Sequence, residues 1–154
     1  MITGKRVQFE ELFPIIEETI KRGKTFSFCA FGNSMLPFIR NGKDTVTLGP
    51  VDDRLDKNDV IFYRRNNGQF VLHRIVKLCS DGSFCLCGDN QFRIERGILK
   101  HQIIAKLNRL ERDGKEIPLR SLSVRLWCCF LPIRRLLLHI KSSATIRIKR
   151  LFKK

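Results

Sequence analysis

Three side chains in this sequence have the chemistry of a hydrolytic site: Ser34, His73 and Asp89. A serine hydroxyl is a weak nucleophile at neutral pH unless a neighbouring base accepts its proton. A histidine, with an ordinary pKa near ~6.5, can accept that proton without strong tuning, and a carboxylate can orient its ring. These residue types predict acyl transfer, in which Ser34 attacks a carbonyl carbon, His73 is the base and Asp89 orients the imidazole.

The surroundings of Ser34 predict an exposed turn. The segment from Gly32 to Pro37 reads Gly-Asn-Ser-Met-Leu-Pro, in which glycine permits unusual backbone angles and proline prevents regular strand pairing. The backbone N–H of Ser34 is the natural first donor to an oxyanion. The second donor is open, because the Asn33 side chain could supply it or Gly32 could serve only to admit the substrate backbone. The candidate substrate-binding and oxyanion residues are Gly32, Asn33, Met35 and Pro37.

Four short segments follow one another in the order found in a known superfamily. They are Ser-Met-Leu-Pro at 34–37, Leu-Asp-Lys-Asn-Asp-Val-Ile-Phe at 55–62, Val-Leu-His-Arg-Ile at 71–75 and Gly-Asp-Asn at 88–90. A single short motif recurs by chance, whereas four in order and at the right spacing are much more specific. Over roughly residues 24 to 110, the chain resembles signal peptidase I and the related LexA-like serine peptidases.

The resemblance implies a serine endopeptidase that binds an extended peptide beside an exposed strand edge, with small residues such as alanine before the scissile bond. His73 stands where the bacterial leader peptidases and LexA-like proteins have a lysine, as in the endoplasmic reticulum, archaeal and spore-former branches. Asn58 replaces a usual glycine before Asp59, and asparagine tolerates left-handed backbone angles. Asp59 competes with Asp89 for the orienting role, and the cleaner Gly-Asp match favours Asp89.

The hydrophobic pattern predicts a mainly β domain with a helix before it. Apolar residues recur at helical spacing over residues 7–22, and Gly23 is a plausible helix end. From residue 25 onward, short apolar runs alternate with turn signals. Asn67-Gly68 and Asp81-Gly82 each lie between two such runs and predict a β-hairpin. In this arrangement His73 lies in the middle of a strand.

The domain organisation follows from these patterns. We expect an amphipathic helix over residues 1–23, a LexA/signal peptidase-like coiled β-sheet domain over 24–118 and a basic, helical, amphipathic tail over 119–154. A chain of 154 residues with 43% hydrophobic content fits one domain with a real core.

Six cysteines are scattered through the sequence. The segment around Cys85 and Cys87 is typical of a strand, and no pair of cysteines has the CxxC spacing of structural zinc sites. Buried, reduced thiols are therefore the better interpretation, and we predict neither a metal site nor a cofactor. The amino-terminal residues are charged and lack a long apolar run, so we expect a cytoplasmic location.

The net charge of +15 comes largely from the tail, because ten Lys and Arg and no acid follow Glu116. The apolar run in the tail is divided by Arg134-Arg135 and is too short to span a bilayer. Its tryptophan, phenylalanine and leucines beside arginines are typical of an interfacial anchor, which favours peripheral attachment to an anionic membrane surface at residues 120–154. Nucleic acid is the weaker alternative, because no helix-turn-helix pattern is present.

Two functions are compatible with these residues. The first is a serine endopeptidase that hydrolyses an extended segment of a protein or precursor peptide, in the manner of a signal peptidase. The second is a non-catalytic peptide- or membrane-surface-binding module that keeps the peptidase fold. The presence of Ser34, His73 and Asp89 together favours the first.

Overall fold

The computed structural model describes residues 9–51 and 54–151, with side chains described for residues 13–51 and 54–143. Within these residues the chain forms an antiparallel sheet of eight strands and two α-helices, so the predicted mainly β class is confirmed. The elements in order are α1 (Phe9–Lys21), β1 (Phe26–Cys29), β2 (Thr45–Gly49), β3 (Val60–Arg64), β4 (Phe70–Leu78), β5 (Phe84–Cys87), β6 (Glu95–Ile98), a 3₁₀ turn (Lys100–Gln102), β7 (Ile103–Arg112), β8 (Lys115–Ile117) and α2 (Leu122–Leu151).

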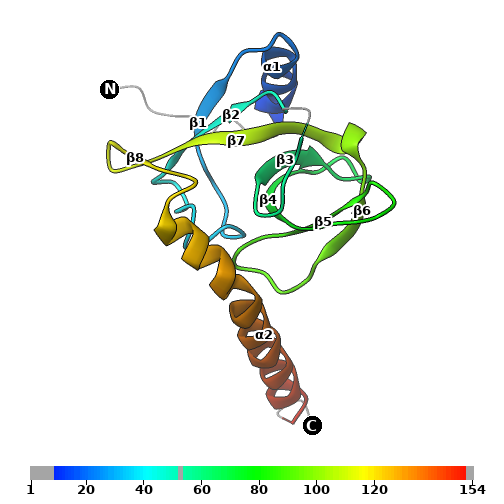
Figure 1. Cartoon of the computed structure of the whole chain (residues 1–154). Coiled ribbons are helices and arrows are strands. Elements are labelled where there is room, and N and C mark those ends of the chain that lie inside the picture. Colours follow the sequence, from blue (N-terminus) through cyan, green and yellow to red (C-terminus); the bar gives the residue numbers. More distant parts are fainter. Residues whose placement is uncertain (1–8, 52–53, 152–154) are drawn as a thin grey trace.

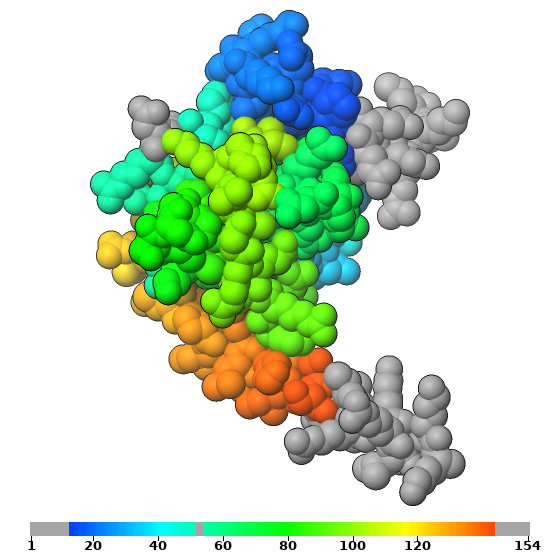
Figure 2. Space-filling view, turned by 90° about the vertical axis from the view of Figure 1, so that its right-hand side faces the viewer, coloured from blue at the N-terminus to red at the C-terminus, as the bar shows by residue number. Residues whose placement is uncertain are grey.

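The strands follow the order β1-β2-β7-β3-β4-β5-β6, and β8 pairs with β7. The long strand β7 therefore lies between the β1–β2 pair and the β3–β4 hairpin. Figure 1 shows the sheet strongly curved, so that β3, β4, β5 and β6 curl around on one side of β7. Helices α1 and α2 lie at opposite ends of the molecule in both views (Figures 1 and 2).

Strand β3 divides the hydrophobic core into two clusters. Val60 and Phe62 point into the cluster that includes the α1 residue Ile16, while Ile61 and Tyr63 point into the other. Successive side chains of a strand face opposite sides of the sheet, which explains why all four are buried although they alternate in direction. The second cluster forms the apolar wall behind His73.

The predicted hairpins are confirmed. Residues Asn67 and Gly68 connect β3 to β4, and Gly68 has φ of 85°. Asp81 and Gly82 connect β4 to β5, and Gly82 has φ of 79°. A residue without Cβ adopts such angles at little cost, so these glycines fix the two turns and the register of β4.

The helix predicted over residues 7–22 is α1, of which residues 7 and 8 lie outside the described part of the chain. Pro14 lies inside this helix without interrupting it. Gly23, at φ of 74°, donates its N–H to the Ile20 carbonyl at 2.9 Å and ends the helix as expected.

The predicted helical tail is α2. It begins directly after Ser121, whose hydroxyl accepts the Val124 N–H at 3.4 Å, and it continues through Pro132. Figure 1 shows α2 running away from the sheet. Across residues 9–51 and 54–151, neither helix has the length and apolar content needed to cross a membrane.

Candidate active site

The turn that carries Ser34 lies between β1 and β2 and is bonded to the turn that follows β5. The Ser34 carbonyl accepts the Asn90 backbone N–H at 2.8 Å, and the Asn33 carbonyl accepts the Asn90 side-chain amide at 3.1 Å. Two of the four sequence motifs, separated by more than fifty residues, therefore meet at this point. In the described structure no hydrogen bond uses the backbone N–H of Ser34, which leaves this donor available to an oxyanion.

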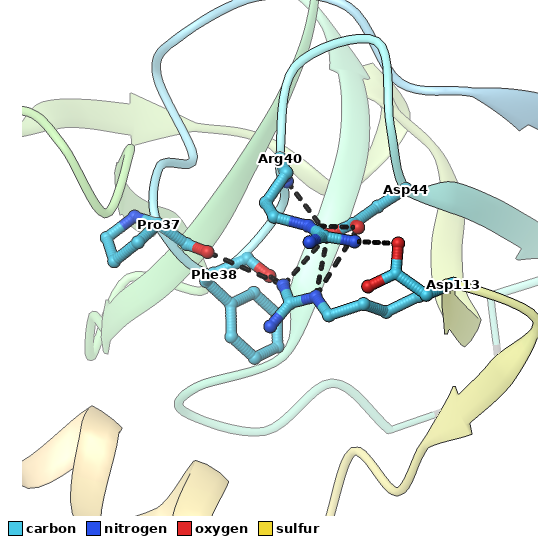
Figure 3. A network of polar contacts seen from close by, with 6 residues as sticks. Pro37, Phe38, Arg40, Asp44 and Asp113 are labelled. Carbon is cyan, nitrogen blue, oxygen red and sulfur yellow. Dashed lines mark hydrogen bonds and ion pairs between the residues drawn. The ribbon is translucent and has the colours of Figure 1, made fainter.

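The far end of the Ser34 turn is held by a buried carboxylate (Figure 3). Asp44 accepts the Arg40 backbone N–H at 2.9 Å and the Arg40 Nε–H at 2.8 Å. Arg112, at the end of β7, donates to Asp44 at 2.8 Å and to the Phe38 carbonyl at 2.9 Å. Burial raises the pKa of Asp44, but the hydrogen bonds from Arg112 and Arg40 outweigh it and keep the pKa below its usual value. This network fixes the turn to the sheet.

His73 lies in the middle of β4, as the sequence predicts, and its side chain is only 1% exposed. Its Nδ1 lies 3.3 Å from the Tyr63 hydroxyl and 3.3 Å from Glu95 Oε1. Glu95 in turn accepts the Arg65 Nε–H at 2.8 Å. A carboxylate can only accept hydrogen bonds, so this environment places the imidazole proton on Nδ1 and leaves the lone pair on Nε2.

The Nε2 atom of His73 has no hydrogen-bond partner in the described structure, although it is buried. A buried polar atom without a partner is uncommon and needs an explanation. The position of this atom supplies one. A Cβ atom built on Gly88 would lie 3.1 Å from His73 Nε2 and 2.5 Å from the Ser34 carbonyl oxygen. The base nitrogen and the Ser34 backbone therefore approach the same small space, which exists because residue 88 has no side chain.

Burial sets the acid–base properties of His73. It lowers the pKa of the imidazole to about 4, and the nearby Glu95 carboxylate opposes this shift. Burial also raises the pKa of Glu95, but hydrogen bonds from Arg65 and Tyr63 outweigh that effect and keep it low. At neutral pH His73 is therefore uncharged and Glu95 is ionised, which are the protonation states required of a base and its orienting carboxylate.

The position of Asp89 differs from the sequence prediction. Both of its carboxylate oxygens are bonded to Arg74, at 2.8 and 2.7 Å, and one also accepts the Trp127 indole N–H at 2.9 Å. Arg74 follows His73 in β4 and so projects to the opposite face of the strand. Asp89 therefore does not bond to the imidazole among the described contacts, and Glu95 is the carboxylate beside His73 instead.

Asp59 does not contact His73 in the described structure either. Its carboxylate accepts the Asp56 backbone N–H at 2.9 Å and pairs with Lys106 at 2.9 Å. The preceding Asn58 has φ of 78°, the left-handed conformation that the sequence predicted for this turn. Asp59 thus stabilises the entry to β3.

The four candidate substrate-binding residues take different positions. Gly32, at φ of 112°, and the buried Met35 line a cavity of about 150 Å³ together with Ser34. The Gly32 N–H donates to Asn41 Oδ1 at 2.9 Å, so it is not available as an oxyanion donor. Asn33 is exposed, and no described contact places its side chain. Pro37 lies outside this cavity, with its carbonyl 3.5 Å from Arg112.

The cavity beside Ser34 is apolar and continues into a larger depression. Its other lining residues are Phe28, Ala30, Phe31, Ile39, Phe70 and Leu72. A neighbouring cavity of about 740 Å³ shares Phe31, Gly32 and Phe70 with it and extends along the β3–β4 turn. In the described structure β1 pairs only with β2, and the first residues of β4 pair only with β3. Phe28 of β1 and Phe70 and Leu72 of β4 therefore line one groove that includes Ser34.

Sequence reasoning missed Glu95, Tyr63 and Arg65. Glu95 lies at the start of β6, where Leu86 of β5 is its partner across the sheet. Tyr63 faces the same side as His73 because the two strands pair Ile61 with His73 and alternate from there. These contacts depend on strand pairing, and no motif in the sequence indicates it for Glu95.

Among the described residues, no three histidine, cysteine or acidic side chains gather in a way that could hold a metal ion. Cys79 and Cys85 lie with their Sγ atoms 3.5 Å apart as free thiols, and burial raises the pKa of Cys85. No family model, curated protein or solved structure matches this chain.

Proposed function

We propose that this protein is a serine endopeptidase with a LexA/signal peptidase-like domain, which hydrolyses an extended segment of a protein or precursor peptide. One observation carries the proposal: the unpartnered Nε2 of the buried His73 and the backbone of Ser34 converge on the space above Gly88. The four ordered motifs and the curved antiparallel sheet add to it.

In this mechanism Ser34 is the nucleophile and His73 is the general base and acid. Nε2 accepts the hydroxyl proton as Ser34 Oγ bonds to the peptide carbonyl carbon, and the same proton passes to the leaving amine. Water then attacks the acyl-enzyme with His73 again as base. The Ser34 N–H faces the developing oxyanion.

Glu95 has the orienting role in this mechanism, in place of Asp89. It accepts the Nδ1 proton and stabilises the imidazolium that forms when Nε2 is protonated. Arg65 and Tyr63 hold Glu95 in position. Asp89 has a structural role, because its bonds to Arg74 and Trp127 secure the turn that contains Gly88 and Asn90.

The groove favours a peptide substrate in extended form. A strand lying beside the start of β4 would hydrogen-bond to the edge of that strand, as in β-strand addition. The apolar cavity of about 150 Å³ at Ser34 suits a small aliphatic side chain beside the scissile bond.

Incubation of the purified chain with a peptide library, read by mass spectrometry, tests the proposal. We expect cleavage by the unmutated chain and none by Ser34→Ala, with a serine-directed fluorophosphonate labelling only the former. Ser123→Ala, which removes an exposed hydroxyl at the start of α2, is the matched control and should cleave normally. Equal cleavage by Ser34→Ala would overturn the assignment of the nucleophile.

A non-catalytic peptide-binding module is the second candidate. The observation that favours it is the groove lined by residues of β1 and β4, which can hold a peptide whether or not Ser34 reacts. In the described structure the hydroxyl of Ser34 makes no hydrogen bond to His73. Saturable peptide binding by a folded chain that neither cleaves nor reacts with the fluorophosphonate would favour this module over the peptidase.

A further inference from the structure

Among the described side chains of helix α2, which end at residue 143, there are two apolar faces, and only one of them contacts the sheet domain. On the inner face Val124 and Leu131 are buried, at 8% and 1% exposed. Arg134 on the same side donates to the Asn90 side chain at 2.7 Å and to the Asp89 carbonyl at 3.2 Å. These contacts attach the first part of the helix to the candidate active site.

The other face of α2 carries a row of apolar side chains directed away from the domain, which we call the outward row. Every member is between 43% and 70% exposed. Most of them recur three or four residues apart, which places them on one side of a helix. The outward row consists of Leu122, Leu126, Phe130, Ile133, Leu136, Leu137 and Ile140. Exposed apolar side chains that gather in this way mark a surface that contacts something other than water.

The charges around the outward row identify the chemistry of what covers it. Arg120 and Arg125 at its beginning and Lys141 at its end are exposed cations. After Glu116 the sequence contains ten Lys and Arg and no acid, so no negative side chain follows the row in the chain. An apolar strip bordered by cations complements a surface that combines acyl chains with negative headgroups.

We propose that the outward row of α2 docks on the surface of an anionic lipid bilayer, with the helix lying in the interface and the sheet domain on its other side. The described part of the helix is not apolar enough to cross the bilayer, because Arg134 and Arg135 interrupt its apolar residues. Figure 2 shows α2 along the end of the molecule opposite to α1, so docking there leaves the sheet uncovered. The contacts of Arg134 lie on the inner face and persist in the docked state.

A second copy of the chain is the main alternative occupant. Residues Leu126, Phe130, Ile133, Leu137 and Ile140 have the four–three spacing of a coiled-coil seam. Stable coiled coils pair opposite charges beside the seam, whereas here every charged residue of α2 is basic. Two such helices side by side would repel each other, and a bilayer with negative headgroups would attract both.

Flotation with lipid vesicles tests the inference. The full chain is mixed with vesicles of phosphatidylcholine alone or with phosphatidylglycerol added. We expect binding to the anionic vesicles, with a loss of roughly fivefold in affinity for each cation removed in Arg120→Gln and Arg125→Gln. The variant Leu126→Gln/Ile133→Gln/Leu137→Gln should lose binding, because it removes apolar side chains that would enter the bilayer. It should still fold, since each of these side chains is exposed in the structure.

The double variant Ile94→Gln/Leu99→Gln is the matched control. It removes exposed apolar side chains near β6, far along the chain from α2, and should bind anionic vesicles normally. Equal binding of the triple variant, or equal binding to neutral vesicles, would overturn the inference. A third result would also overturn it: the unmutated chain forms a dimer in light scattering but does not float with vesicles, and the triple variant is a monomer. Ser34→Ala should float like the unmutated chain, so this test is independent of the proposed peptidase activity.

Discussion

His73 and Arg74 are neighbours in β4, yet they serve two buried polar clusters of opposite character. On one face of the strand, the Arg74 guanidinium donates to Asp89 twice and to the Asn58 carbonyl at 2.9 Å, and it lies 4.4 Å from the centre of the Phe38 ring. On the other face, the described contacts of His73 are all made through Nδ1, and Nε2 has no partner among the described residues. We call these the Arg74 cluster and the His73 cluster.

This difference in hydrogen bonding suggests different roles for the two clusters. In the Arg74 cluster both carboxylate oxygens of Asp89 already accept hydrogen bonds, so the ion pair has no free polar group to offer a substrate. In the His73 cluster the buried Nε2 has lost its contact with water without gaining a hydrogen bond, so its lone pair can still accept a proton. The Arg74 cluster should therefore control stability, and the His73 cluster should control activity.

The largest expected effect is on activity. His73→Gln removes the proposed base but keeps a polar side chain of similar size. Cleavage should fall by roughly 10³–10⁴-fold, while the free energy of unfolding changes by about 1 kcal/mol or less. Initial rates and denaturant melts measure the two quantities. His101→Gln, at an exposed position, is the control and should change neither. Loss of folding in His73→Gln would remove the distinction between the clusters.

The complementary change acts on stability. Arg74→Met leaves the buried Asp89 carboxylate without its ion-pair partner, and the free energy of unfolding should fall by roughly 3–5 kcal/mol. The double variant Arg74→Met/Asp89→Leu removes both charges and should recover much of this loss. Urea unfolding followed by circular dichroism measures it. An Arg74→Met variant as stable as the unmutated chain would contradict the structural role of this pair.

Gly88 tests the boundary between the two clusters, because it precedes Asp89 and lies against His73. The Cβ of Gly88→Ala would contact the Ser34 carbonyl oxygen at 2.5 Å, so the backbone must shift. We expect a fall in cleavage rate of roughly 10²-fold, from displacement of the reacting groups. Gly97→Ala offers a comparison, since a Cβ there meets no atom within 4 Å and the backbone strain of a side chain at φ of 72° should lower stability without displacing the reacting groups. Similar losses of activity in both variants would exclude a specific role for Gly88.

Glu95→Gln sharpens the comparison of the two carboxylates. It removes the charge that stabilises the imidazolium, and kcat should fall by about 10²-fold with little change in KM. Because Glu95 raises the pKa of His73, its removal should also move the acidic limb of the pH profile to lower pH. Asp89→Asn should instead lower stability. An acidic limb unchanged in Glu95→Gln but moved in Asp89→Asn would reverse the two assignments.

The smallest effect is expected from mild acid. A base must be uncharged, and burial lowers the pKa of His73 to about 4, so kcat/KM should remain nearly constant from pH 7 to about 5 and fall as the pH passes through about 4. The unfolded chain binds a proton at this histidine below about pH 6.5, so the folded state should lose stability as the pH falls from there. An acidic limb near pH 6.5 would show that His73 is solvated during catalysis.

The sequence predicted the local features of the site well. The hairpins around Asn67-Gly68 and Asp81-Gly82, and the position of His73 in a strand, depend on residues close together in the chain. The carboxylate that contacts His73 depends instead on residues far apart in the chain. Asp89 lies in a recognisable motif, but alternation along β4 directs Arg74 to it and His73 away from it.

Glu95 could not be found in the same way. It reaches His73 only because β5 lies between β4 and β6 and brings the start of β6 alongside. Sequence patterns indicate which face of a strand is buried, but the neighbours across a sheet depend on the strand order. The composition of the tail likewise indicated an apolar surface on α2. The contacts of Trp127 and Leu131 were needed to show which apolar side chains face the sheet domain and which face outward.

The place of β7 in the sheet determines when the nascent protein can finish folding. Strand β2 pairs with β7, so Thr45 cannot form its strand pairing until its partner Glu111 has been synthesised. At roughly 5–20 residues per second, ribosomes need several seconds to synthesise the intervening chain. Meanwhile the β1–β2 pair has an open edge and an uncovered apolar face. The incomplete chain is prone to aggregation during this interval, so a run of slow codons placed just before β7 should increase aggregation of the newly made chain.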